Sequence, residues 1–307
     1  MPQRLAVILG PTATGKSHCA IELAKRMNGE IISGDSMLVY RGMDIGTAKP
    51  SLPEREGIPH HLIDILDPYE SFNVMEFKSR AAALIEEINA RGKLPIIAGG
   101  TVLYIKALLE DYQFAAAESD IKLRTALEKE AAMTGEAALY AKLVRLDPHA
   151  AANIHPHNVR RVIRALEVAM NGETVSSASS DSVVYDAVVF GLHMERELLY
   201  ERINRRVNIM AAAGLTDEVK KLLNDGADPE WQSMQGIGYR QMVWHCRGGM
   251  SLEEALDKVK QATRNFAKRQ QTWYKKLPYV QWFSLEEQTD YADVVAAMER
   301  ILVEKFK

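Results

Sequence analysis

A glycine-rich turn near the start of the chain constrains the fold more than any other feature. Residues Gly10–Ser17 read GPTATGKS and match G-x-x-x-x-G-K-[ST] at every fixed position. The apolar run Leu5–Leu9 precedes this turn, and the helical pattern Lys16–Met27 follows it. A strand, such a turn and a helix in that order predict a P-loop, whose backbone N–H groups and helix N-terminus surround a phosphate. We therefore expect a ligand with a diphosphate or triphosphate group.

The P-loop pattern also gives its residues separate tasks. The Lys16 ammonium is expected to reach the outer phosphate, and the Ser17 hydroxyl is expected to hold Mg²⁺. The predicted diphosphate-binding residues are the whole loop: Gly10, Pro11, Thr12, Ala13, Thr14, Gly15, Lys16 and Ser17.

P-loop nucleotidases usually carry a second acid that helps to hold the magnesium ion. The strand pattern Leu94–Ala98 ends in two glycines and Thr101, without an acid. Asp35, which follows the short strand pattern Glu30–Ser33, is the other candidate. It could ligate metal, accept a proton from a substrate, or satisfy backbone N–H groups in a turn. Periodicity does not choose between these roles.

Strand and helix patterns alternate through the first hundred residues. A helical pattern at Phe72–Arg91 separates the strand pattern Glu30–Ser33 from the strand pattern Leu94–Ala98. Such alternation predicts right-handed crossovers and a parallel sheet. The segment Arg41–Tyr69 holds four prolines and little periodicity, which predicts a long functional loop.

The pattern changes in the middle of the chain and then returns. Residues 118–171 are almost wholly helical in character, and the polar stretch Ser176–Ser182 is typical of a flexible connector. Strand patterns recur at Val183–His193 and Tyr279–Ser284, with helices between them and a closing helix. We predict an α/β fold in which a P-loop-type parallel sheet flanked by helices carries an inserted all-helical domain. The expected bounds are 1–115 with 183–307 for the core, and 116–182 for the insertion.

Charge gives two conflicting indications about the partner. The chain has 38 Lys and Arg against 41 Asp and Glu, a net charge of −3 that taken alone speaks against nucleic acid. Resolved along the chain, residues 258–276 hold seven basic residues and no acid, with Phe266, Trp273 and Tyr274 between them. Such a stripe can follow a phosphate backbone, although each aromatic residue is more often a core anchor. A second basic cluster lies in the predicted insertion and comprises Arg160, Arg161 and Arg164. Outside both groups, Arg206 is a weaker candidate for a contact with the diphosphate.

Cysteine and apolar content limit the class of protein. Cys19 and Cys246 are too few for a disulfide framework or a four-thiolate zinc site. Cys19 lies in a helical pattern and is expected to pack as a small apolar residue. No apolar stretch approaches the ~20 residues of a membrane span. We expect a cytoplasmic monomer without a membrane segment.

Several blocks of the sequence together resemble the bacterial tRNA dimethylallyltransferases. They occur in order from residue 10 to about 275, and the run from Asp35 to Pro50 is the most specific. The blocks are Gly10–Ser17, Ser33–Pro50, Pro59–Asp64, Gly99–Tyr104, Arg160–Glu167 and Gly236–Gln241.

The resemblance implies that the P-loop holds the diphosphate of dimethylallyl diphosphate, with Mg²⁺ as cofactor. The prenyl group would pass to N6 of the adenosine just 3′ of a tRNA anticodon. By the same resemblance Asp35 is the general base, with Thr101 as a supporting hydroxyl and Lys16 as the third catalytic residue. The target base would have to leave the anticodon stack to reach the allyl group.

The resemblance also implies contacts with the tRNA anticodon stem-loop. Two positions depart from the family pattern: Leu38 stands where members carry glutamine, and Val102 where they carry glycine. A leucine cannot make the hydrogen bonds of a glutamine to the target base. The implied tRNA-binding residues are Asp35, Ser36, Met37, Leu38, Thr101, Arg124, Val159, Arg160, Arg161, Val162, Ile163 and Arg240.

Two other functions fit parts of the sequence. A P-loop, an α/β core and a helical lid also suit a small-molecule kinase, although such an enzyme needs no basic stripe. A non-enzymatic RNA-binding module that uses a nucleotide as a switch is the third candidate.

Overall fold

The computed structural model describes residues 3–112, 121–171 and 183–307, which divide into two units. Unit 1 comprises residues 1–109 and 182–307, and unit 2 comprises residues 110–181. The predicted connector Ser176–Ser182 lies outside the described residues. Because each unit has its own core, the two are described separately.

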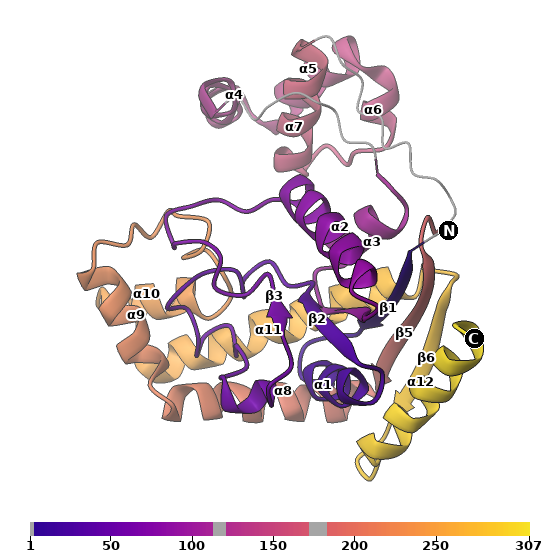
Figure 1. The fold of residues 1–307 in the computed structure, drawn as a ribbon. Helices are drawn as coiled ribbons and strands as arrows, with labels where there is room; N and C mark the ends of the chain where they lie inside the picture. Colours follow the sequence, from indigo (N-terminus) through magenta and orange to yellow (C-terminus); the bar gives the residue numbers. More distant parts are fainter. Residues whose placement is uncertain (1–2, 113–120, 172–182) are drawn as a thin grey trace. The chain divides into compact units, whose positions relative to one another are not determined.

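Unit 1 is built on a six-stranded sheet in which all paired strands are parallel, in the order β3-β2-β4-β1-β5-β6 (Figure 1). This confirms the predicted parallel sheet. The strands are β1 (Arg4–Leu9), β2 (Gly29–Ser33), β3 (His60–His61), β4 (Leu94–Gly99), β5 (Asp186–Met194) and β6 (Val280–Leu285). Strand β3 and the short 3-10 helix η1 (Pro53–Arg55) lie inside the segment predicted as a loop. A two-residue strand is too short to produce an alternating pattern, so the sequence gives no sign of it.

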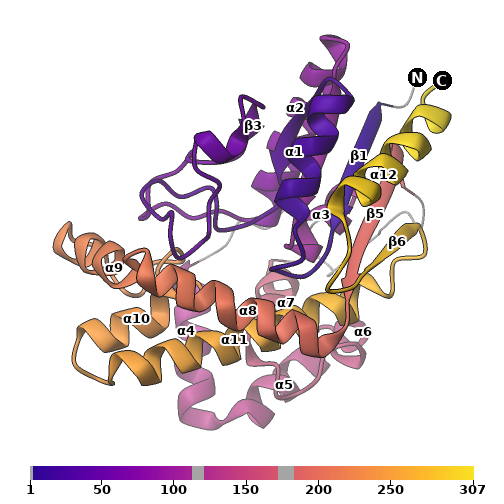
Figure 2. The same cartoon turned by 90° about the horizontal axis from the view of Figure 1, so that it is seen from below.

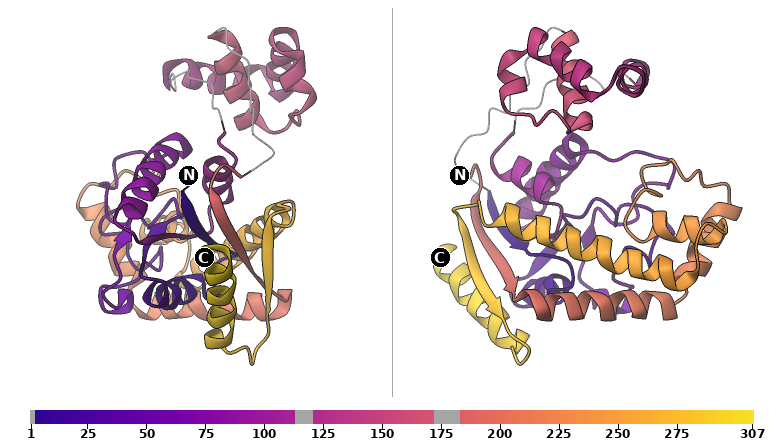
Figure 3. Two further views of the ribbon diagram at one scale, coloured as in Figure 1. Left: turned by 45° about the vertical axis from the view of Figure 1, so that its right-hand side comes forward. Right: turned by 180° about the vertical axis from the view of Figure 1, so that it is seen from behind.

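Helices cover both faces of the sheet. Figures 1 and 3 show α1 and α12 over one face, and α2 and α3 over the other. The helices of unit 1 are α1 (Lys16–Arg26), α2 (Val74–Ala90), α3 (Val102–Leu109), α8 (Arg196–Ala212), α9 (Leu215–Asn224), α10 (Tyr239–Cys246), α11 (Leu252–Tyr274) and α12 (Tyr291–Lys305).

The central strand β1 shows why its sequence is apolar without interruption. Leu5, Val7 and Leu9 pack into the cluster that contains α2 and α3, whereas Ala6 and Ile8 pack against α1 and α12. A strand covered on both faces has no solvent-facing position, so all five side chains are fully buried. Cys19 of α1 is fully buried in the second cluster, which confirms its predicted packing role.

Parallel pairing brings three loops to the same edge of the sheet. Leu9 pairs with Gly99 and Ser33 pairs with Ala98, so β1, β2 and β4 end side by side. Strands β1 and β5 are neighbours in the sheet, but the chain continues from β1 to β2 on one side and from β5 to β6 on the other side. Crevices at such switch points are where open α/β sheets bind ligands. Helices α8 and α11 run side by side, as seen in Figure 2.

Unit 2 contains only helices among its described residues, as the sequence predicts for the insertion. Its core is formed by Leu127, Leu139, Leu143, Leu166 and their neighbours. The helices are α4 (Ile121–Thr134), α5 (Glu136–Leu146), α6 (Pro148–Ala152) and α7 (Val159–Met170). In the described ranges of both units, no helix is long and apolar enough to span a membrane.

Candidate active site

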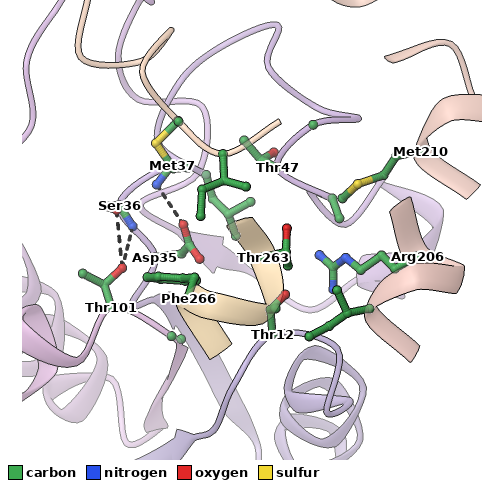
Figure 4. Close-up of a pocket in the computed structure, with 18 of the residues that line it drawn as sticks. Thr12, Asp35, Ser36, Met37, Thr47, Thr101, Arg206, Met210, Thr263 and Phe266 are labelled. Carbon is green, nitrogen blue, oxygen red and sulfur yellow. Dashed lines mark hydrogen bonds between the residues drawn. The ribbon is translucent and has the colours of Figure 1, made fainter. Parts of the chain in front are cut away.

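A cavity of about 370 Å³ lies at the carboxyl edge of the sheet in unit 1. Its walls come from the P-loop, from the loops after β2 and β4, and from helices α8, α10 and α11 (Figure 4). Lys16, Asp35, Thr101 and Arg206, which the sequence places far apart, all line it. The cavity therefore gathers the predicted phosphate-binding and proton-accepting residues in one space.

The P-loop has the backbone geometry of an anion cradle. Gly10, Ala13 and Gly15 all have positive φ angles, of 155°, 67° and 86°. Gly15 is the N-cap of α1. Among the described residues, no side chain caps the start of this helix, and its first turn contains no acidic residue. The first N–H groups of α1 are therefore available to an anionic ligand.

Side chains hold the loop in this shape. The Thr14 hydroxyl donates to the Pro11 carbonyl at 2.8 Å, and the Lys16 ammonium donates to the same oxygen at 2.6 Å. From α12, the Tyr291 hydroxyl donates to the Thr14 carbonyl at 3.1 Å, and its ring lies against Gly15. A Cβ atom on Gly15 would lie 2.5 Å from that ring, so the close packing requires glycine.

Two cations face the same part of the cavity. Burial, with a further contribution from the nearby Arg206 guanidinium, lowers the pKa of Lys16 to about 7, while Asp35 partly opposes the shift. Burial also lowers the pKa of Arg206, whose Nε atom is buried without a hydrogen-bond partner among the described residues. Two half-buried cations beside an uncapped helix N-terminus form a site for a multiply charged anion.

Asp35 lies in a turn and also faces the cavity. Its Oδ1 atom accepts the Met37 N–H at 2.8 Å, and Figure 4 shows the other carboxylate oxygen pointing into the cavity. The Thr101 Oγ1 atom accepts the Ser36 N–H at 3.1 Å and lies 3.4 Å from the Ser36 hydroxyl oxygen. One oxygen of Asp35 therefore fixes the turn, which leaves the other for a ligand.

Gln270 connects the P-loop with the loop after β4, and its role was not expected from the sequence. Its side chain is 3% exposed and reaches from α11 to the edge of the sheet. Its Oε1 atom accepts the Thr12 N–H at 3.2 Å, and its Nε2 atom donates to the Gly100 carbonyl at 2.7 Å. No local pattern marks this residue, because a glutamine within a basic helical stripe resembles any surface position.

The remaining walls are largely apolar and were not predicted, except for Phe266, which was noted as an aromatic residue of the basic stripe. Ile203, Val207 and Met210 come from α8, and Val259 and Phe266 come from α11. Their helical spacing predicts only core packing. Gly46, Thr47 and Ala48, which line the cavity as well, lie within the most specific block of the family resemblance.

The other residues predicted for RNA contact have different environments. Ser36, Met37 and Leu38 line the cavity, whereas Arg240 is exposed on α10 with its guanidinium 5.9 Å from the Trp244 ring centroid. On α11 the basic residues differ: Lys260 pairs with Asp257 at 3.2 Å, and Arg264 donates to Asn204 at 2.7 Å. The exposed members of the stripe are Lys258, Lys268 and Arg269 on α11, and Lys275 and Lys276 directly after it.

In unit 2 the predicted contacts also separate by exposure. Arg160 and Arg161 are exposed at the start of α7, next to the half-buried Val159. Val162 and Ile163 are buried in the unit 2 core, so their side chains pack internally instead of facing a ligand. Arg124 donates to the buried carboxylate of Glu167 at 2.9 Å. The exposed arginines of α7 are therefore the members of this group whose whole side chains can meet a phosphate.

Known proteins resemble this chain over almost its whole length. A model of the IPP transferase family matches residues 38–277. A tRNA dimethylallyltransferase of Geobacillus kaustophilus is 49% identical over 311 residues, which cover 100% of this chain and 98% of the relative. One from an Exiguobacterium species is 54% identical over 271 residues, 88% of this chain and 87% of the relative.

Solved structures of transferases resemble this chain as well. The crystal structure of the full-length tRNA isopentenylpyrophosphate transferase from Bacillus halodurans has a TM-score of 0.75 and 46% identity, covering 99% of this chain and 96% of that chain. A eukaryotic dimethylallyltransferase described as acting on tRNA has a TM-score of 0.82 and 30% identity, covering 97% of this chain and 78% of that chain.

Proposed function

The chain belongs to the IPP transferase family, and from this premise we propose a specific reaction for its cavity. The enzyme transfers the dimethylallyl group of dimethylallyl diphosphate to N6 of the adenosine 3′-adjacent to a tRNA anticodon. The N6–C1 bond forms, the C1–O bond to the diphosphate breaks, and N6 loses a proton. The products are N6-isopentenyladenosine in tRNA and free diphosphate.

The leaving diphosphate is bound at the P-loop end of the cavity. Negative charge develops on the bridging oxygen as the C1–O bond breaks, and groups already aimed at that charge lower the barrier. Three sets of donors already face that charge: the Lys16 ammonium, the Arg206 guanidinium and the first N–H groups of α1. They stabilise it without rearrangement of solvent. The apolar side chains of α8 and α11 enclose the dimethylallyl group and exclude water from the reacting carbon.

Asp35 accepts the proton from N6. An exocyclic adenine amine is a weak nucleophile, so a carboxylate within reach of its proton assists the attack. One Asp35 oxygen is already fixed by the Met37 N–H, which orients the other toward the cavity (Figure 4). Thr101 fixes the neighbouring Ser36 backbone and so holds this loop against the end of β4.

The residues at the P-loop end fit Mg²⁺ bound together with the diphosphate. The Ser17 hydroxyl lines the cavity, and the described residues contain no group of three or more His, Cys, Asp or Glu side chains that could hold a metal alone. Mg²⁺ commonly binds through substrate phosphates, water and one or two protein oxygens, which matches this donor set. Bound there, the ion neutralises charge on the leaving diphosphate.

The acceptor base reaches the cavity only if it leaves the anticodon stack. We propose that Arg160 and Arg161 contact the tRNA backbone, whose charge makes such contacts sensitive to salt. At the base itself the Leu38 side chain offers apolar contact and no hydrogen bond, which leaves hydrogen-bonded recognition to other residues of the loop around Asp35. The chain supplies all of these residues, so we propose that it acts as a monomer.

The observation that carries the proposal is a single cavity with a diphosphate cradle and a carboxylate that faces the same space. The test is incubation with labelled dimethylallyl diphosphate and unmodified tRNA, and separately with ATP and small-molecule acceptors. We expect label in the tRNA and none without Mg²⁺. Turnover of ATP without labelled tRNA would instead support the kinase.

A further inference from the structure

A carboxylate outside the cavity accepts hydrogen bonds from the backbone that leads into one of the cavity walls. Glu218, on α9, accepts the N–H groups of three consecutive residues: Asp44 at 2.9 Å, Ile45 at 2.7 Å and Gly46 at 3.0 Å. Oε2 accepts the first two and Oε1 accepts the third. Hydrogen bonds to an ionised acceptor are roughly twice as strong as neutral ones, so three of them fix this turn firmly.

Tyr239 completes the same anchor from α10. Its hydroxyl donates to Glu218 Oε1 at 2.6 Å, and its side chain is fully buried. The ring packs directly on Gly46, where a Cβ atom would lie 2.5 Å from the ring carbons. The turn is therefore held by Glu218 through its backbone N–H groups and by Tyr239 through close packing.

The turn has its own internal bonds but still depends on an outside anion. The Thr47 hydroxyl donates to the Met43 carbonyl at 2.6 Å, and the Lys49 N–H donates to the Asp44 carbonyl at 2.9 Å. These bonds satisfy carbonyl groups and leave the N–H groups of Asp44, Ile45 and Gly46 to Glu218. Without that carboxylate, these three adjacent donors would have no hydrogen-bond acceptor among the described residues.

The anchored turn forms one wall of the cavity. Gly46, Thr47 and Ala48 line it, and Figure 4 shows Thr47 across the cavity from Thr12 of the P-loop. The same segment of chain, after β2, carries Asp35, whereas the phosphate cradle follows β1. A shift of the turn would change the space beside Asp35 and leave the cradle in place.

We propose that Glu218 is a positioning residue, which holds the Gly46–Ala48 wall so that the acceptor adenine lies correctly against Asp35. This inference rests on the proposed function. Glu218 is not among the residues that line the cavity, so it acts through the backbone it binds. It therefore affects use of the acceptor and not binding of the diphosphate.

The test compares Glu218→Gln with Asp217→Asn, which makes the same charge change at the adjacent exposed residue of α9. A glutamine keeps the shape but places an NH₂ group against backbone N–H donors. We expect kcat/KM for tRNA to fall on the order of 10- to 100-fold, the effect of a small misplacement of a reacting group. The Kd for inorganic diphosphate should stay within about twofold, because the P-loop has separate supports.

Two further measurements separate positioning from general stability. Hydrogen exchange at residues 44–46, which needs no activity, should become faster in Glu218→Gln and stay unchanged in Asp217→Asn. Gly46→Ala, which pushes the turn from the Tyr239 side, should reproduce the tRNA defect with Glu218 intact, even where Glu218→Gln fails to fold.

The outcomes are distinct. Unchanged exchange at residues 44–46, a tRNA kcat/KM within twofold of the control, or an equal loss of diphosphate affinity would overturn the role of Glu218. A wild-type enzyme that leaves tRNA unlabelled would refute the proposed function instead, while the exchange measurement would still show whether Glu218 holds the turn.

Discussion

Diphosphate binding should depend on pH because Lys16 titrates near neutrality. Burial and the neighbouring Arg206 lower the pKa of Lys16 from 10.5 to about 7 in the free protein. An anionic ligand favours the ammonium form, so binding above pH 7 requires uptake of a proton. The protonated fraction falls about tenfold for each further pH unit, which predicts about a hundredfold weaker binding at pH 9 than at pH 6. Below pH 7 the dependence should level off, since Lys16 is already charged.

Isothermal titration with inorganic diphosphate from pH 6 to pH 9 measures this effect. Diphosphate itself titrates, so the same series on Lys16→Arg serves as the control, because a guanidinium stays charged throughout. We expect the wild-type affinity to fall relative to the control by about tenfold per unit above pH 7. Titration in two buffers of different ionisation enthalpy should show net proton uptake near pH 8. Equal slopes for both proteins would refute the desolvated lysine.

Two other perturbations follow from the described contacts. Glu30 is 1% exposed; burial alone would raise its pKa, but hydrogen bonds from Lys93, His61 and Arg91 outweigh burial and lower it to about 2. Glu30→Gln should therefore reduce the free energy of unfolding by about 2 kcal/mol in denaturant melts at pH 7, less than for a fully buried pair because its partners reach solvent. The difference should be full above pH 4.5 and should vanish as pH falls through about 2; a constant difference would contradict the ion-pair explanation. Changing Arg160 and Arg161 to Ala should weaken tRNA binding and lower the slope of log K against log salt by up to about 2, measured by filter binding, whereas Arg145→Ala on α5 should do neither. An unchanged slope would show that α7 is not a tRNA surface.

Most of the fold of unit 1 could be predicted, because strong local patterns encode it. The P-loop has a glycine turn between an apolar run and a helix, and parallel pairing then requires Asp35 and Thr101 to share an edge with it. Elements that depend on tertiary contacts were not predicted. Strand β3 is only His60–His61 and forms because β2 offers a free edge. Helix α3, which directly follows Thr101, was not predicted either.

The site divides in the same way. Lys16 and Ser17 follow from a local motif, and the role of Asp35 follows from the family resemblance. Gln270 and Glu218 act across more than 150 residues of chain, through hydrogen bonds to backbone atoms that leave no local pattern. The net charge of −3 was a poor guide to the partner, because a total does not show how basic residues such as Arg160 and Arg161 are grouped.

In this cavity, diphosphate binding and proton removal are carried out by different residues. The variant Asp35→Asn tests that division most directly. An asparagine keeps the side-chain oxygen that can accept the Met37 N–H but cannot take the N6 proton. We expect prenyl transfer to tRNA to fall by a factor on the order of 100 or more. The Kd for inorganic diphosphate, measured at pH 6 where Lys16 is protonated with or without the Asp35 charge, should change less than about twofold. An equal loss of transfer and of diphosphate affinity would contradict the account, since Asp35 would then belong to the phosphate site.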